Sequence, residues 1–185
     1  MSTINDVPQD RRHIVFSCQK CGNCCRSPRK DFSVSLYNDD ILNGATATGL
    51  SPENFVARYC RLVDETAIFT DHVISTRRIE LKKEGNDCVF LKENLCSIYD
   101  HRPFSCKNGP FVSGLLCSAA NWKSFADGCA GLGEGKIYGP DEIIHFLNLE
   151  ARVEAAYERD QKENPMFQKF FSGAYVRPAT MDCQR

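Results

Sequence analysis

Four cysteines within eight residues, in the pattern Cys18-x2-Cys21-x2-Cys24-Cys25, constrain this chain more than any other feature. Such a density of thiols indicates either a disulfide framework or a set of metal ligands. The first three cysteines have the spacing of the first three ligands in bacterial ferredoxin loops, but the fourth follows directly on the third. Gly22 can adopt a positive φ, which allows a tight turn that holds two sulfurs close together.

The chain has eleven cysteines, and their arrangement disfavours a disulfide framework. Eleven is an odd number, and no second C-x-x-C follows, which a plain zinc ribbon would need. The N-terminus has no basic segment followed by an apolar one, so we expect a cytoplasmic protein whose thiols stay reduced. Single cysteines instead follow beside predicted turns, at Cys88, Cys96, Cys106, Cys117 and Cys129. These are the expected complement of the dense first loop.

Composition bounds the function classes. A chain of 185 residues with 42% hydrophobic residues can bury one core, and its net charge of −1 gives no electrostatic reason to bind nucleic acid or a membrane. No apolar run is long enough to span a bilayer. We therefore expect metal ions as the partners, with no nucleic acid and no membrane; nothing identifies a protein partner.

The pattern of apolar residues predicts short elements and few long ones. Strands are expected at 13–16 and 32–36 and as one or two strands over 66–83, with loop and short pieces over 111–138. Ser51 and Pro52 have the residue types that begin a helix, and its apolar face is expected to include Leu62 and Val63. A longer helix is predicted from Pro140 to about Asp160, with a short closing helix near Phe167.

These elements favour a small, irregular α+β domain centred on metal, with a loop-rich cysteine core and C-terminal helices. We expect residues 1–12 to form a loose arm, 13–172 the single domain, and 173–185 an irregular tail. Cys60 falls within the helix that Ser51 begins and is predicted to be a buried thiol rather than a ligand.

The cysteines with their neighbours resemble a known family. The loop at 18–25, Cys88-Val-Phe-Leu, Cys96-Ser-Ile-Tyr-Asp-His-Arg-Pro, Cys106-x3-Pro110 and Cys129-Ala-Gly-Leu-Gly-Glu-Gly-Lys136 are similar to the bacterial YkgJ-like cysteine-cluster family, the zinc- or iron-chelating CxxCxxCC domains. The resemblance spans about residues 16–136. It implies a site of eight cysteine ligands: Cys18, Cys21, Cys24, Cys25, Cys88, Cys96, Cys106 and Cys129. Cys117 lies outside this pattern.

Two functions follow from these observations. The first is a protein that holds zinc or an iron–sulfur cluster in a cage of cysteine thiolates, because all-sulfur ligation suits both. The second is an iron–sulfur-dependent or zinc-assisted transferase or oxidoreductase, such as a protein methylase, because flagellin lysine methylases carry the same cysteine motif. Whether the chain is an enzyme stays open, and an acidic residue near the cysteines, such as Asp87 or Asp100, is a candidate for its chemistry. Arg102 is expected to donate to carbonyls or sulfurs. Lys20, Arg26, Arg29 and Lys30 are expected to form a solvated face, and their charges would also offset that of the thiolates.

Overall fold

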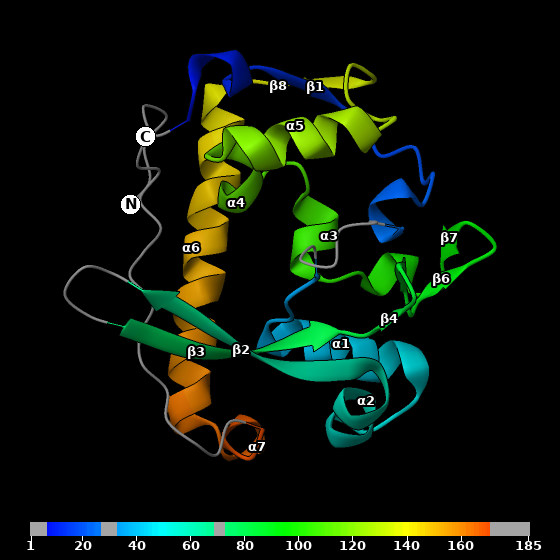
Figure 1. The fold of residues 1–185 in the computed structure, drawn as a ribbon, viewed down its shortest axis with the longest axis vertical. Helices are drawn as coiled ribbons and strands as arrows, with labels where there is room; N and C mark the ends of the chain where they lie inside the picture. Colours follow the sequence, from blue (N-terminus) through cyan, green and yellow to red (C-terminus); the bar gives the residue numbers. More distant parts are fainter. Residues whose placement is uncertain (1–6, 27–32, 69–72, 171–185) are drawn as a thin grey trace.

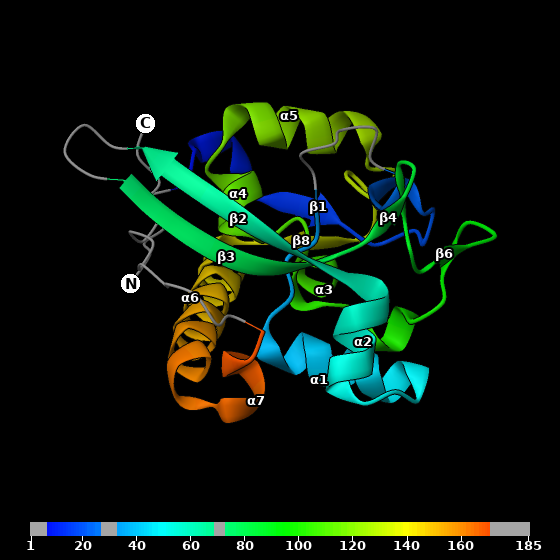
Figure 2. The same ribbon diagram turned by 60° about the horizontal axis from the view of Figure 1, so that its bottom comes forward.

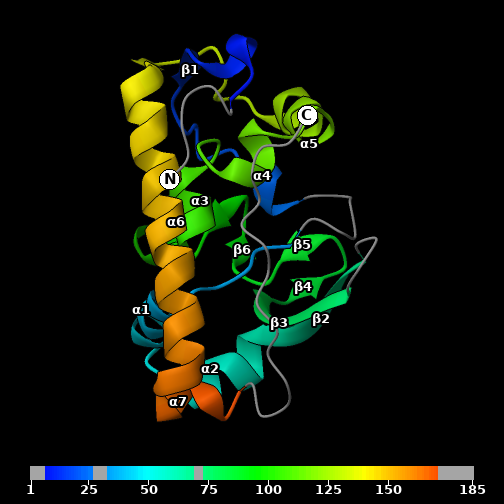
Figure 3. The same cartoon turned by 90° about the vertical axis from the view of Figure 1, so that its left-hand side faces the viewer.

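The computed structural model describes residues 7–26, 33–68 and 73–170 of the chain. Its architecture is α+β, which confirms the predicted fold class: short two-stranded sheets, a centre rich in loops, and a long C-terminal helix. That helix, α6 (Pro140–Glu163), runs along one side of the molecule (Figure 1). The view from the side places the β2–β3 and β4–β5 hairpins away from it, across the molecule (Figure 3). No helix in these ranges has the length and apolar character to cross a bilayer.

Every strand pair in the described residues is antiparallel. A long ribbon, β2 with β3, crosses the molecule in front of β1 and β8 (Figure 2), and two very short hairpins follow it along the chain. The pair β1–β8 instead joins segments that are far apart in the sequence. The strands are β1 (Ile14–Phe16), β2 (Cys60–Ile68), β3 (Val73–Leu81), β4 (Lys83–Glu84), β5 (Asp87–Cys88), β6 (Leu91–Lys92), β7 (Leu95–Cys96) and β8 (Lys136–Tyr138).

Short helices and 3-10 turns connect these strands. The α-helices besides α6 are α1 (Asn38–Thr48), α2 (Pro52–Tyr59), α3 (Phe104–Asn108), α4 (Ser113–Leu116), α5 (Ala119–Gly128) and α7 (Pro165–Gln168). The 3-10 turns are η2 (Gln9–Arg11), η3 (Asn23–Cys25) and η4 (Tyr99–His101).

The larger hydrophobic core lies where α1, α2, β3, α6 and α7 meet. Phe55 of α2 is 1% exposed, and its ring centroid lies 5.7 Å from that of Tyr59 and 6.1 Å from that of Phe90. Gly44 makes this packing possible, because a Cβ there would lie 2.2 Å from the Phe55 ring. On the other side of the core, Tyr37 packs edge-on against Tyr157 of α6.

A smaller core covers the other end of α6. It contains Val7, Ile14, Phe111, Leu116, Ile143 and Leu147. The described part of the expected N-terminal arm takes part in it: Val7 is fully buried, and the Arg11 guanidinium donates to the Leu116 carbonyl oxygen at 2.5 Å. The domain boundaries at 12 and 172 stay a prediction, and the expected tail at 173–185 lies outside the described residues.

The start of α2 confirms one expectation and its end corrects another. Ser51 accepts a hydrogen bond from the Asn54 amide at 3.3 Å, as an N-cap does. The helix ends at Tyr59, so Cys60, Leu62 and Val63 belong to β2 instead of the helical face. The β-branched and charged residues that follow Tyr59 pair with β3, and this pairing ends the helical spacing.

Two further expectations differ from the structure. The segment 111–138, expected to be loop with short pieces, contains a ten-residue helix, α5. This helix has no buried residue, so its sequence lacks the apolar period that predicts a helix. The expected strand at 32–36, of which residue 32 lies outside the described ranges, forms only an isolated bridge, between Ser35 and Glu80. Its amide and carbonyl groups nevertheless bond to β3, since Leu36 donates to the Ile79 oxygen at 2.8 Å.

Candidate metal centre

The loop at 18–25 makes two left-handed turns between its cysteines. Gly22 has φ 75°, which confirms the expected positive value, and Lys20, a residue with a side chain, has φ 54°. Cys18, Cys21 and Cys24 are exposed, whereas Cys25 is half-buried at the end of η3. The loop therefore presents most of its sulfurs on one open surface.

The four downstream cysteines come from four different short elements. Cys88 ends β5, Cys96 ends β7, Cys106 lies in α3, and Cys129 follows the last residue of α5. All four are free thiols and are half-buried. Cys88 and Cys96 also pack against the larger hydrophobic core, which ties the two short hairpins to it.

Polar contacts hold the loop against these downstream segments. The Asn23 side chain donates to the Gly128 carbonyl oxygen at 3.1 Å, and Arg26 donates to the Asn94 side chain in the β6–β7 turn. At Gly22 the approach is so close that a Cβ would lie 2.8 Å from the Asn94 carbonyl oxygen. Figure 1 shows η3 beside the end of α5 and the short hairpins. The two halves of the cysteine pattern thus meet in space.

A hydrogen bond joins the side chains of Cys24 and Cys25. A hydrogen bond from Cys25 lowers the pKa of the Cys24 thiol to about 6, against the opposing effect of burial and with help from Arg102. The same hydrogen bond and burial raise the pKa of Cys25. Near neutral pH, therefore, Cys24 is the thiolate and Cys25 the donor.

The charge of Cys24 reaches every downstream cysteine. Burial is the first cause that raises the pKa of Cys88, Cys96, Cys106 and Cys129, and in each of them the negative charge of Cys24 adds to the effect. Cys24 is therefore electrostatically coupled to all four of these cysteines.

Arg102 is the principal cation of the site. Its guanidinium donates to the Tyr99 carbonyl oxygen at 2.9 Å and to the Cys18 sulfur at 3.8 Å, which confirms the expected donation to carbonyls and sulfurs. Its charge also lowers the pKa of Cys96 against the dominant effect of burial. Lys83, which pairs across the β4–β5 hairpin with Cys88, acts on that thiol in the same direction. Arg29 and Lys30 lie outside the described residues.

Asp40 positions the helix that carries Cys106, and sequence reasoning missed it. One carboxylate oxygen accepts from the Phe104 amide at 2.8 Å, at the start of α3, and the other from the Tyr37 amide at 3.0 Å, at the start of α1. Burial raises the pKa of Asp40 to about 6 despite both bonds. Asp40 is the third residue of α1, the position from which a capping-box acid reaches back to the N-cap amide.

Two other described cysteines are separate from this group. Cys60 is a free thiol that is 4% exposed, and burial raises its pKa to about 12, which confirms the expected buried thiol. Cys117 is disulfide-bonded and so is not a free ligand. Within residues 7–26, 33–68 and 73–170, no three His, Cys, Asp or Glu side chains stand in a geometry that could hold a metal ion without moving.

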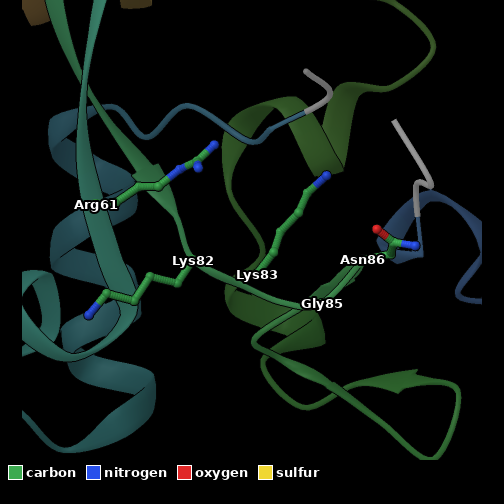
Figure 4. A pocket seen from close by; sticks show the side chains of 5 residues that line it. All are labelled: Arg61, Lys82, Lys83, Gly85 and Asn86. Atoms are coloured by element: carbon green, nitrogen blue, oxygen red, sulfur yellow. The ribbon is translucent and has the colours of Figure 1, made fainter. Parts of the chain in front are cut away.

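The two cavities identified next to this region are lined by residues other than the candidate ligands. One, of about 320 Å³, is lined by Arg61, Lys82, Lys83, Gly85 and Asn86 (Figure 4). Arg61 and Lys83 extend toward the same space, but Arg61 already pairs with Glu80 at 2.9 Å, and Lys82 turns away to donate to the Ala57 and Arg58 carbonyl oxygens. The other, of about 480 Å³, lies over Tyr59 and Phe90.

Comparison with known proteins identifies the family. Residues 17–130 match the CxxCxxCC family, whose description is "Putative zinc- or iron-chelating domain". The chain belongs to the CxxCxxCC family. It is also similar to "Uncharacterized protein MJ0661" of Methanocaldococcus jannaschii, with 30% identity over 145 residues that cover 74% of this chain and 68% of that protein. No solved structure matches the chain significantly.

The donor set of this CxxCxxCC domain fits the metals in the family description. Every one of the eight candidate ligands is a free cysteine, and thiolate sulfur is the ligand that zinc and iron–sulfur centres prefer. A cluster of thiols with raised pKa values holds protons that a cation can replace.

Proposed function

We propose that this chain holds zinc or iron, the latter as an ion or as an iron–sulfur cluster, through thiolates from both halves of the cysteine pattern. The ligands would come from Cys18, Cys21, Cys24, Cys25, Cys88, Cys96, Cys106 and Cys129. The observation that carries the proposal is the contact between the loop at 18–25 and the segments that present Cys96 and Cys129, through the bonds of Arg26 to Asn94 and of Asn23 to the Gly128 oxygen. When bound, the metal supplies a positive charge that relieves the mutual repulsion of the thiolates.

The protein contributes position, shielding and charge balance. The short hairpins hold Cys88 and Cys96 against the hydrophobic core, which limits water on one side of the group. Four thiolates around one divalent zinc carry about −2 in charge, and Arg102 and Lys83 act against it. Because the thiols do not surround one point as they stand, the proposal includes a small closure of the loop when metal binds.

The test compares ligand variants with a cysteine control. The protein is purified without oxygen, its zinc, iron and sulfide are quantified, and its visible spectrum is recorded. We expect Cys24→Ser and Cys106→Ser each to lower metal content and to weaken affinity by about 100-fold or more, because a tetrahedral thiolate site loses a ligand. Cys60 is a free thiol outside the candidate group, so Cys60→Ser should keep full metal content.

The results distinguish zinc from an iron–sulfur cluster and also test whether the proposed site is correct. A brown protein with iron and sulfide identifies a cluster, and a colourless protein with stoichiometric zinc identifies a zinc site. Full metal content in both Cys24→Ser and Cys106→Ser would show that the centre lies elsewhere. In the described residues we find no arrangement that favours the transferase or oxidoreductase alternative, and we do not propose it.

A further inference from the structure

The cavity beside the β4–β5 hairpin is lined by three cationic residues and by no acidic one. Its volume is about 320 Å³, and the residues that line it are Arg61, Lys82, Lys83, Gly85 and Asn86. Figure 4 shows the Arg61 and Lys83 side chains, from β2 and β4, extending toward the same space. The Lys82 ammonium instead bonds to carbonyl oxygens in the last turn of α2, so two of the three cations serve the cavity.

A buried carboxylate holds Arg61 in position. Glu80 lies opposite Arg61 on β3 and is 3% exposed. One of its oxygens accepts from Nε of Arg61 at 3.2 Å and from Nη2 at 2.9 Å, and its other oxygen accepts from the Ser33 hydroxyl. Within the described residues, Nη1 of Arg61 has no hydrogen-bond partner. The guanidinium is therefore fixed by one edge and can donate to a ligand from the other.

The β4–β5 hairpin supplies the remaining polar groups of the cavity. Lys83 begins β4, and the register of the hairpin places it opposite Cys88. The turn between the two strands is Gly85–Asn86, in which Gly85 has φ 65°. Asn86 adds a side-chain amide that can donate hydrogen bonds. A guanidinium, an ammonium and an amide around one small space form an environment that favours an anion.

We propose that this cavity binds a small oxyanion, either phosphate or the carboxylate of a small metabolite. The guanidinium fork matches the geometry of both groups, and the ammonium adds a second positive charge. A volume of about 320 Å³ is at the lower end of the range for small-molecule sites, which suits a ligand of few non-hydrogen atoms. Binding does not require a metal, but the bound anion lies beside the hairpin that carries Cys88, one of the proposed metal ligands.

NMR on the full, reduced chain labelled with nitrogen-15 tests this binding. Sodium phosphate or sodium succinate replaces sodium chloride at constant ionic strength and pH 7. We expect at least one of the two to shift the backbone amide signals of Gly85 and Asn86 in a saturable way, with a Kd of about 1 mM or lower. A shift with phosphate alone identifies a phosphate site, and a shift with succinate alone identifies a carboxylate site. The absence of a saturable shift with either anion would overturn the proposal.

Variants separate specific binding from a general effect of charge. Lys83→Gln removes one cation and should weaken binding about tenfold, as the loss of a hydrogen bond to a charged group does. The double variant Arg61→Gln with Glu80→Gln removes the other cation without leaving a buried carboxylate unpaired, and it should weaken binding by a similar factor.

A matched control loses the same charge at a distant place. Arg152→Gln, at an exposed position of α6 across the molecule from the hairpins, should bind the anion as the wild type does, because salt screens charges beyond about 10 Å (Figure 3). Equal weakening by Lys83→Gln and Arg152→Gln would overturn the proposal. None of these variants changes a proposed metal ligand, so the outcome is independent of the test of metal content.

Discussion

The half of the molecule around Phe55 and the half around Cys24 are held together by different means. Around Phe55, helices α1, α2 and α6 bury large side chains, and the aromatic rings pack in contact. Around Cys24, two-residue hairpins and single turns carry half-buried or exposed thiols, joined by a few polar contacts. The first half has the burial that stabilises a fold by itself, whereas the second has a surplus of like charges that a cation would relieve.

The largest loss of stability should come from a substitution in the half around Phe55. Phe55→Ala removes a ring that is 1% exposed, and the lost burial plus the cavity should lower the free energy of unfolding by about 3–5 kcal/mol. Urea denaturation measures it, with and without zinc. Leu42→Ala, at a side chain 40% exposed, should cost less than about 0.5 kcal/mol. A zinc-dependent effect of Phe55→Ala would mean that the two halves are not separate.

Gly44→Ala tests the same packing by adding an atom to it, whereas Phe55→Ala removes a ring. In Gly44→Ala the new Cβ would lie 2.2 Å from one Phe55 ring atom and 2.5 Å from another, so α1 or the ring must shift, at a cost of about 1–3 kcal/mol. Gly114→Ala in α4 is the control, since an added Cβ there has no neighbour within 4 Å. It should be neutral or stabilise by up to about 1 kcal/mol in thermal unfolding. Equal stabilities for the two variants would refute the close approach at Gly44.

The sequence predicted the chemistry of the cysteine half better than its shape. Cysteine spacing is local information, so Cys18 to Cys25 and the positive φ at Gly22 could be inferred directly. The contacts that complete the site, such as Asn23 with Gly128, depend on α5, a helix without a buried face. Because α5 lacks an apolar period, the sequence did not predict this helix or the segment at its end that presents Cys129.

In the rest of the fold, local sequence patterns predicted where α2 begins but did not predict the long-range pairings. Ser51 and Pro52 mark the start of α2, but nothing within α2 shows that Leu62 must leave the helix to pair with β3. Likewise, Asp40 has the position of a capping residue, but its second bond, to the Phe104 amide, joins residues far apart in the chain. Tertiary partners of this kind are not encoded in spacing.

Asp40 links the two halves and gives their junction a pH dependence. Burial raises its pKa from 3.8 to about 6, so the folded state binds this proton more tightly than the unfolded chain. The stabilising contribution is therefore fully present below pH 4 or so and is lost as the pH rises through about 6. Relative to Asp40→Asn, the wild type should gain about 1 kcal/mol of stability between pH 7.5 and pH 5.

Chemical denaturation at the two pH values measures this double difference. Asp39→Asn removes the neighbouring first-turn carboxylate, which is exposed, and serves as the control for loss of a helix N-terminal charge. A pH-independent difference between the wild type and Asp40→Asn would show that Asp40 is not a buried link between α1 and α3.

A comparison of Gly22 with Gly85 separates the stability of the fold from the binding of metal most sharply. Both have positive φ, 75° and 65°, so alanine at either position should cost about 1–2 kcal/mol in backbone strain. Only at Gly22 would the new Cβ also meet backbone, 2.8 Å from the Asn94 oxygen; at Gly85 nothing lies within 4 Å. Gly22→Ala should therefore push the loop away from the β6–β7 turn and weaken zinc binding about tenfold or more, while Gly85→Ala binds zinc as the wild type does.

Competition with a chelating indicator measures both affinities. Equal affinities in two equally destabilised variants would show that the metal needs no contact between the loop and the hairpin, and the comparison between the two halves would then lose its structural basis.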